Sequence, residues 1–331
     1  MLRLPIFGTK SPSSIDELVA AMAQPGAHLI AGGTDLLPNL KHGLHEPQLL
    51  VSIDRVEELR HITWDEDAGV LRIGAGVTLS QIASDNEIGE RFPSLARAAG
   101  LVASPLIRNM ATLGGNINLD TRCRWVNQSE FWRSAIGGCL KSGGDVCHVV
   151  PKGRSCVAAM SSDCVPVLTS LGAQLVQVGA NGQRELALAD YYSSDGISHT
   201  KREAGEITVE VRIPIPAGAS CAHYSKWTVR KSIDFPLVSI AMNFALSGPG
   251  DDATIEAATI CLGVLAAKPK VLRTDKLAGL RLGDEETALL VGELCHAQGK
   301  TLDNVPYEAG YRRSMLRVFG KRAVRELAES R

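Results

Sequence analysis

The sequence predicts an α+β protein whose first part, about residues 1–218, is a two-lobed α/β domain. Three observations carry this prediction. Helical and strand patterns alternate along the first two thirds of the chain, which is typical of α/β architecture. The segment Pro214-Ile-Pro216-Ala-Gly218 indicates a boundary, because its prolines and glycine interrupt both kinds of element. Beyond it, three strand-like runs with short gaps predict a three-stranded antiparallel sheet, and two helical stretches complete a second domain over residues 219–331.

Composition and charge are those of a folded globular protein. The chain of 331 residues is long enough for two cores, and 45% hydrophobic with 21% charged residues excludes a disordered chain. A net charge of -1, from 35 basic and 36 acidic residues, predicts no contact with nucleic acid or membrane lipid. No stretch approaches the ~20 apolar residues that span a bilayer, and the first residues lack the apolar core of a signal peptide. We therefore expect a cytoplasmic protein whose cysteines are ligands or buried thiols.

The first lobe, about residues 1–58, predicts a βαβ-like unit. Ser14 and Glu17 have the spacing of a capping box that opens a helix running to about residue 23. A short buried strand is expected at residues 28–31, followed by a helix that begins near Asp35 and a strand at 49–53.

The second lobe, about residues 59–218, mixes strands and helices. Residues 65–69 predict a hairpin turn before a strand at 71–75, and Thr78 with Gln81 matches another capping box. Further elements are expected as helices at 93–100 and 163–171 and as strands at 173–178 and 206–213. In the second domain the expected strands are 222–229, 237–246 and 253–265, and the expected helices are 285–297 and 308–327.

Glycine pairs mark two turns that suit a phosphate group. Gly32 and Gly33 follow the first strand directly, and Gly114 and Gly115 lie between a threonine and an asparagine. Adjacent glycines let the backbone approach a ligand closely and let N–H groups converge on an anion. Neither pair fits the Rossmann or P-loop pattern, and a third glycine turn at residues 74–78 has the same character. These residues by themselves indicate either ordinary turns or a site for a phosphate-bearing cofactor.

Residues 30–36 and 111–117 resemble the two FAD-binding motifs of the flavoprotein subunits of molybdenum hydroxylases, the xanthine dehydrogenase and carbon monoxide dehydrogenase family. Residues 73–78, 162–163 and 224–226 with 234–236 are similar to further family elements, in the same order along nearly the whole chain. The resemblance implies bound FAD, a PCMH-type FAD-binding domain and a C-terminal domain like that of the CO dehydrogenase flavoprotein.

The resemblance also implies which residues contact FAD. Around the pyrophosphate and ribityl region it places Leu29, Ile30, Ala31, Gly32, Gly33, Thr34, Asp35 and Leu36, and on the phosphates from the other lobe Thr112, Gly115 and Asn116. It places Val77 and Val102 in the flavin or adenine pocket, Asp163 and the carbonyl of Val209 as hydrogen-bond acceptors, and Lys226 as a nearby cation. A structural role stays open for two of them, Asp163 as a helix N-cap and Lys226 as a solvated strand residue.

A cysteine-rich insert, about residues 119–160, separates the second glycine pair from the next helix. Cys123, Cys139, Cys147 and Cys156 are spaced by 15, 7 and 8 residues. Thiolates are soft ligands that suit iron–sulfur clusters, Zn(II) or Cu(I), and the spacing, which contains no Cys-x-x-Cys, does not specify the metal. A closed zinc site and a loop with incidental buried thiols stay open as alternatives.

The insert resembles that of the β subunits of 4-hydroxybenzoyl-CoA reductases, which carries an extra [4Fe–4S] cluster. The likeness lies in residues 120–123, 127–130, 132–134, 139–141 and 147–149. It implies that Cys123, Cys139, Cys147 and Cys156 are the cluster ligands. We expect Cys164 to be a buried thiol outside the cluster.

An FAD and a cluster in one chain make an electron-transfer subunit. The sequence contains no Ser-His-Asp arrangement, no H-E-x-x-H and no molybdopterin pattern, so we expect no catalytic residue here. The resemblance implies a molybdopterin-containing large subunit, a small subunit with two [2Fe–2S] clusters and a dimer of heterotrimers. It further implies the reductive dehydroxylation of 4-hydroxybenzoyl-CoA to benzoyl-CoA, with reduced ferredoxin as donor.

Two other functions stay open. In the first, the chain serves an oxidising hydroxylase of the same family and passes electrons to NAD or a quinone. In the second, it is a non-redox docking module with a four-cysteine zinc site.

Overall fold

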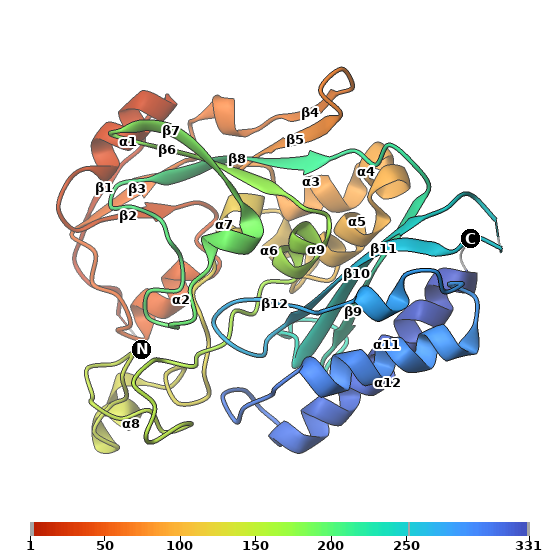
Figure 1. Ribbon diagram of the computed structural model, residues 1–331. Coiled ribbons are helices and arrows are strands. Elements are labelled where there is room, and N and C mark those ends of the chain that lie inside the picture. The colour runs from red at the N-terminus through yellow and green to blue at the C-terminus, as the bar shows by residue number, and fades with distance from the viewer. Residues whose placement is uncertain (1–2, 251, 330–331) are drawn as a thin grey trace.

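The computed structural model describes residues 3–250 and 252–329 and has an α+β fold built on three sheets (Figure 1). A three-stranded and a five-stranded sheet lie within the first 214 residues, and a four-stranded sheet with two long helices forms the rest. The predicted fold class is confirmed. Among the described residues, no helix combines the length and the apolar character needed to cross a membrane.

The first sheet is parallel and leads into the first glycine pair. Its strand order is β1-β3-β2. The elements are β1 (Gly8–Lys10), α1 (Ile15–Met22), β2 (Ala27–Ile30), α2 (Leu36–Lys41), β3 (Leu49–Ser52) and the short 3-10 helix η1 (Glu57–Leu59). The predicted βαβ unit is present as β2-α2-β3. Ser14 caps α1 by accepting from the Glu17 N–H at 3.2 Å, but the Glu17 carboxylate accepts from Ser13, so only half of the predicted capping box forms.

The second sheet is antiparallel throughout, in the order β4-β5-β8-β6-β7. Its strands are β4 (Ile62–Asp65), β5 (Val70–Gly74), β6 (Gln174–Gly179), β7 (Gly182–Ala187) and β8 (Ile207–Pro214). The helices of this lobe are α3 (Leu79–Ser84), α4 (Asn86–Arg91), α5 (Pro93–Gly100), α6 (Pro105–Arg108), α7 (Leu113–Ile117), α9 (Cys164–Ser170) and α10 (Leu188–Tyr191). The capping box of Thr78 and Gln81 is complete, as predicted. In Figure 1, α3, α5 and α9 lie between this sheet and the last one.

The insert projects from the first two lobes as a loop-rich lobe of its own at the lower left of Figure 1. It contains one short helix, α8 (Glu130–Ala135), which Ser129 caps by accepting from the Trp132 N–H at 3.2 Å. Its base is closed by a pair of backbone hydrogen bonds between Arg122 and Ala159, at 2.8 and 2.7 Å. The two ends of the insert are therefore held together.

The last sheet has four strands, in the order β12-β11-β10-β9, rather than the three predicted. The elements are β9 (Ser220–Trp227), β10 (Val238–Leu246), β11 (Ile255–Gly263), β12 (Lys270–Val271), η2 (Asp275–Leu277), α11 (Glu285–Gln298) and α12 (Ala309–Glu329). The additional strand is β12, two residues that pair with Cys261 and Leu262 at the edge. So short a segment has no alternating pattern of its own, which is why the sequence did not reveal it.

Two of the hydrophobic cores connect the sheets. In the largest, Tyr224 and Cys261 of the last sheet are buried together with Leu168 of α9 and Val211 of β8. Another core joins the first sheet to the second. The three sheets are therefore packed into one continuous body.

Candidate functional site

A cleft of about 940 Å³ opens between the first lobe and the segments 111–120 and 197–205. This volume lies at the upper end of the range for cofactor pockets. All eight predicted residues of the first loop line it: Leu29, Ile30, Ala31, Gly32, Gly33, Thr34, Asp35 and Leu36. Thr112 and Gly115 line it as well. The two glycine pairs, which are about 80 residues apart in the sequence, thus meet at one cleft.

The first loop needs its glycines for two different reasons. Gly32 packs so closely on the 105–110 segment that an added β-carbon would lie 1.9 Å from the Met110 carbonyl oxygen. Gly33 has a φ of +68°, in the left-handed region that glycine adopts without strain. The backbone therefore turns sharply from β2 into α2, where it lines the cleft.

The second loop begins α7. The Thr112 hydroxyl accepts from the Gly115 N–H at 3.1 Å and caps the helix. A β-carbon on Gly114 would lie 2.8 Å from the Ala75 carbonyl oxygen, whereas one on Gly115 would meet only the Thr112 hydroxyl, at 3.2 Å. Gly114 thus serves packing, and Gly115 leaves room on the cleft side.

Six predicted residues do not line this cleft: Val77, Val102, Asn116, Asp163, Val209 and Lys226. Val77 is buried in the large core, and Val102 packs against that core. The carbonyl of Val209 accepts from the Ala75 N–H at 2.9 Å, and the Asn116 side-chain oxygen accepts from the Ser162 hydroxyl at 2.6 Å. For these six residues, contact with the flavin stays a prediction.

Asp163 and Lys226 form a buried ion pair between the two domains. Their charged atoms are 3.1 Å apart, and their side chains are only 5% and 6% exposed. The Tyr224 hydroxyl donates to the other Asp163 oxygen at 2.6 Å, and Lys226 also donates to the Leu101 carbonyl at 2.9 Å. Burial raises the pKa of the Asp163 carboxyl, against the opposing effects of Lys226 and Tyr224. Asp163 occupies the N-cap position of α9, yet its side chain does not cap the helix, and Lys226 is not a solvated strand residue.

Several polar side chains of the cleft were missed at the level of sequence: His28, His45, Asp120, His199 and Arg202. Burial lowers the pKa of His28 and of His199, which favours the neutral form of both imidazoles. Only Asp120 had a sequence signal, since it belongs to a segment that carries the family likeness. The others come together from positions up to 174 residues apart, which no local pattern records.

Arg122 connects the insert to the first glycine loop. Its guanidinium forms an ion pair with Asp35 and stacks over the Phe235 ring at 3.9 Å from the ring centre. Asp35 also accepts from the Asn39 amide at 3.1 Å. The arginine thereby offsets the negative charge of Asp35, a carboxylate that lines the cleft.

The four cysteines of the insert line one small second cavity, together with hydrophobic residues, Lys141 and His148. Each of them, all within the described part of the chain, is a free thiol that is 6–8% exposed. Cys164 lies fully buried in α9, outside this cavity. His148 lines it, but its Nε2 is 2.6 Å from the Gly138 carbonyl and its ring stacks on Trp125.

Each cysteine sulfur accepts a hydrogen bond from a group two or three residues further along the chain. The donors are the Trp125 and Val126 N–H groups to Cys123, the Ser142 hydroxyl to Cys139 at 3.3 Å, the Val150 N–H to Cys147 at 3.4 Å and the Ala158 N–H to Cys156 at 3.4 Å. Hydrogen bonds of this kind stabilise sulfur that carries negative charge.

Burial in the cysteine cavity shifts the pKa of two of the four thiols. Burial raises the pKa of Cys123 to about 11 and also raises that of Cys156, which the positive charge of Lys141 opposes. Among the described residues, no three His, Cys, Asp or Glu side chains are grouped as a single metal ion would require. By its chemistry, a donor set of four soft sulfurs around one cavity suits either an iron–sulfur cluster or Zn²⁺.

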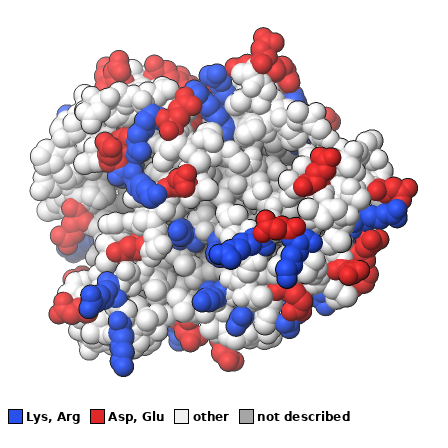
Figure 2. Space-filling view, viewed as in Figure 1, with Lys and Arg blue, Asp and Glu red and all other residues white. Residues whose placement is uncertain are grey.

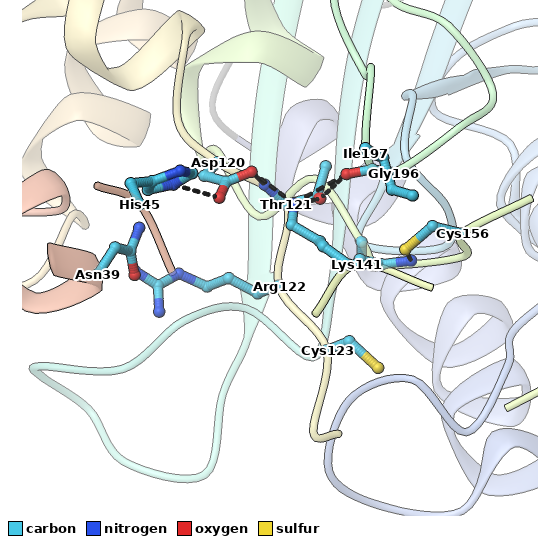
Figure 3. A network of polar contacts seen from close by, with 12 residues as sticks. Asn39, His45, Asp120, Thr121, Arg122, Cys123, Lys141, Cys156, Gly196 and Ile197 are labelled. Atoms are coloured by element: carbon cyan, nitrogen blue, oxygen red, sulfur yellow. Dashed lines mark hydrogen bonds and ion pairs between the residues drawn. The ribbon is translucent and has the colours of Figure 1, made fainter. Parts of the chain in front are cut away.

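A polar network connects the two sites (Figure 3). Asp120 lines the cleft, where His45 Nε2 is 3.1 Å from its carboxylate. Lys141 lines the cysteine cavity and donates to the other oxygen of Asp120 at 2.5 Å. Although burial acts to raise it, the pKa of Asp120 lies well below its usual range because His45 and Lys141 stabilise the carboxylate.

Two family matches decide the affiliation. Residues 6–216 match the FAD binding domain in molybdopterin dehydrogenase. Residues 223–327 match the CO dehydrogenase flavoprotein C-terminal domain. The chain belongs to the FAD-binding subunits of the molybdenum hydroxylase family.

Individual relatives agree. The aldehyde oxidoreductase FAD-binding subunit PaoB of Escherichia coli (strain K12) is 32% identical over 265 residues, 76% of this chain and 78% of that protein. The carbon monoxide dehydrogenase medium chain of Hydrogenophaga pseudoflava is 27% identical over 325 residues, 97% of this chain and 96% of that protein. The crystal structure of quinoline 2-oxidoreductase from Pseudomonas putida 86 superposes with a TM-score of 0.76 at 27% identity and 99% coverage of both chains. The molybdenum hydroxylase subunit is therefore an FAD-binding oxidoreductase component, as the sequence predicted.

Proposed function

We propose that this subunit transfers electrons in a molybdenum enzyme of the 4-hydroxybenzoyl-CoA reductase type, with FAD in the cleft and one [4Fe–4S] cluster in the cysteine cavity. The main support for this proposal is that four cysteines spread over 34 positions line a single cavity beside the cleft: Cys123, Cys139, Cys147 and Cys156. In the cleft, residues 29–36 with Thr112 and Gly115 hold the diphosphate of FAD.

The proximity of the two sites supports a relay. Asp120 lines the cleft and Cys123 lines the cysteine cavity. Three residues of chain span at most about 11 Å, so this backbone segment bridges the sites over a short distance. When bound, an iron–sulfur cluster supplies one-electron transfer and FAD supplies one- or two-electron transfer.

The likeness of the insert favours a cluster over zinc. Four thiols that share one cavity suit either group by their chemistry. The segments around three of the four cysteines, 120–123, 139–141 and 147–149, are those that resemble the cluster-binding insert. The donors to each sulfur also support a cluster, whose potential depends on hydrogen bonds to its sulfurs.

The surface of the insert suits an acidic electron carrier such as reduced ferredoxin. Residues 119–160 contain six basic and three acidic side chains, in a chain whose net charge is -1. Arg124, Lys152 and Arg154 are exposed, as are Glu130 and Asp145, and Figure 2 shows basic and acidic groups on this lobe at the lower left. A net positive surface beside the cysteines steers a negatively charged donor to them.

The remaining partners follow from the proposed enzyme type. A large subunit holds molybdopterin and the substrate, a small subunit carries two [2Fe–2S] clusters, and the assembly is a dimer of heterotrimers. Two electrons and two protons convert 4-hydroxybenzoyl-CoA into benzoyl-CoA and water. This chain accepts the electrons from the donor one at a time and delivers them to the small subunit, and it does not touch the substrate.

A second candidate is an oxidising enzyme of the same family, in which electrons leave this chain for NAD or a quinone. The names of the relatives favour it, since they include an aldehyde oxidoreductase and a nicotinate dehydrogenase. The insert argues for the reductive direction, because a second redox group next to the cleft gives a one-electron carrier its own entry point. Assays of the native complex with reduced ferredoxin and aryl-CoA thioesters, and separately with NAD and a quinone, distinguish the two directions.

The cluster is tested by counting metal in protein purified without oxygen. Cys139→Ala should remove about four iron atoms per chain, the content of one [4Fe–4S] cluster, and leave FAD bound. Cys164→Ala is the matched control, since it removes a buried thiol outside the cavity and should leave iron unchanged. One zinc and no iron in the wild-type chain would contradict the proposal and favour a structural clip in a docking module.

A further inference from the structure

Lys141 is a largely buried cation between the cysteine cavity and the cleft. Its side chain is 9% exposed, and it lines the cavity together with the four cysteines. Its ammonium donates to Asp120 Oδ1 at 2.5 Å, Thr121 Oγ1 at 2.5 Å and the Gly196 carbonyl at 2.8 Å. In Figure 3 the side chain extends from the side of Cys156 to Asp120.

The three hydrogen bonds fix the position of this charge. An ammonium has three N–H donors, and here each has an acceptor, so the group cannot turn into the cavity to pair with a sulfur. The acceptors come from different parts of the chain. Gly196 lies 75 residues beyond Thr121, whose hydroxyl also donates to the Gly196 carbonyl at 2.6 Å. Lys141 therefore links residues 120–121 to Gly196 at a position between the cysteine cavity and the cleft.

We infer that Lys141 is a positioning residue for electron transfer, whose fixed positive charge favours the reduced state of the group held by the four cysteines. The inference rests on the proposed function. Reduction of a thiolate-bound cluster adds one electron and no proton, while the one-electron carrier protein that donates it is oxidised. The added negative charge interacts strongly with a buried cation, because the protein interior screens charges less than water does.

A change at Asp120 should shift the reduction equilibrium in the opposite direction from a change at Lys141. The Asp120 carboxylate lies against the ammonium and partly cancels its field at the cysteines. Neutralising Asp120 should therefore favour the reduced state, whereas neutralising Lys141 should disfavour it. General damage to the fold would not be expected to shift the reduction equilibrium of the two variants in opposite directions.

The test is a redox titration of the cluster by electron paramagnetic resonance, in the complete complex purified without oxygen. Lys141→Gln should shift the reduction equilibrium about tenfold toward the oxidised state, equivalent to about 59 mV for one electron. Asp120→Asn should shift the equilibrium toward the reduced state. Lys141→Arg, which retains the positive charge, should keep the wild-type value. Lys152→Gln, an equal change of charge at an exposed position of the same insert, should leave it unchanged. Iron and flavin contents are measured for every variant.

The outcomes separate this inference from the proposed function. A wild-type complex without iron overturns both. A complex with its full iron content whose potential is the same in Lys141→Gln, or moves equally in Lys152→Gln, overturns the inference alone. If Lys141→Gln loses its iron, Asp120→Asn decides: a shift toward the reduced state supports the inference, and no shift overturns it.

Discussion

Replacing Lys226 by methionine removes the positive member of a buried ion pair and leaves its carboxylate in place. The side chains of Asp163 and Lys226 are 5% and 6% exposed, so water cannot take over the role of the ammonium. Among the described residues, the Tyr224 hydroxyl is the donor to the carboxylate that remains. The pair connects β9 with the start of α9, so the perturbation acts where the two domains pack together.

The magnitude follows from this burial. Removing one partner of a buried pair leaves an uncompensated charge and costs about 3–5 kcal/mol. For cooperative units of this size each kcal/mol shifts the midpoint by roughly 2–4 °C, so the melting temperature should fall by roughly 6–20 °C. Lys231→Met removes an exposed lysine and is the matched control, with an expected change within about 0.5 kcal/mol.

The loss of stability caused by Lys226→Met should be smaller at acid pH than at alkaline pH. The folded-state pKa of Asp163 is already raised by burial, and losing Lys226 raises it further. A raised carboxyl pKa means that the folded state binds the proton more tightly, so this contribution to stability is present at acid pH and is lost as pH rises through the folded pKa. The destabilisation of Lys226→Met should therefore shrink below neutral pH, by up to about 1.4 kcal/mol per pH unit.

Scanning calorimetry at pH 8 and pH 5, with and without added FAD, measures both effects. A fall of less than about 2 °C at pH 8, or an equal fall at both pH values, would refute the reasoning from the buried charge. A loss that appears only with FAD present would instead indicate that Lys226 acts through the flavin.

Two further substitutions probe the glycine loops. Gly115→Val should weaken FAD binding by about tenfold or more with an unchanged circular dichroism spectrum, because the side chain fills the cleft beside Thr112. The control, Gly218→Val at an open surface position, should bind FAD normally. Full flavin occupancy in Gly115→Val would contradict the assignment of the phosphate site. Gly32→Ala should destabilise the chain by about 1–3 kcal/mol, since its β-carbon would overlap the Met110 carbonyl. An unchanged melting temperature would show that the first loop does not pack on Met110 as described.

Elements with strong local patterns were predictable. The helix at residues 93–100 was predicted with the bounds that α5 has, and the Thr78 capping box forms in full. Strand β7 (Gly182–Ala187) was missed, because its glycine, glutamine, arginine and glutamate lack the residue types that favour strands. It is a strand because it pairs with β6 at the edge of the sheet. Helix α8, six residues inside a loop-rich insert, was missed because it is too short to show a helical period.

The candidate site divides in the same way. The glycine pairs and the four cysteines could be selected from the sequence, because their chemistry is a property of residue type. Where these groups lie relative to one another could not be predicted from residue type. Six of the predicted FAD residues lie outside the cleft, and His199 and Arg202 lie on it without any sequence signal.

The sequence by itself determined the family, the order of its two domain types, the two glycine-rich loops and the set of four cysteines in the insert. These depend on local composition and on motifs of a few residues, which can be recognised without knowing the fold. The tertiary structure decided what each group faces: that the thiols share one cavity, that Asp163 binds Lys226 and Tyr224 instead of capping α9, and that Lys141 lies between the two sites. Such contacts join residues tens to more than a hundred positions apart, and their energies depend on burial and distance, which only the folded chain determines.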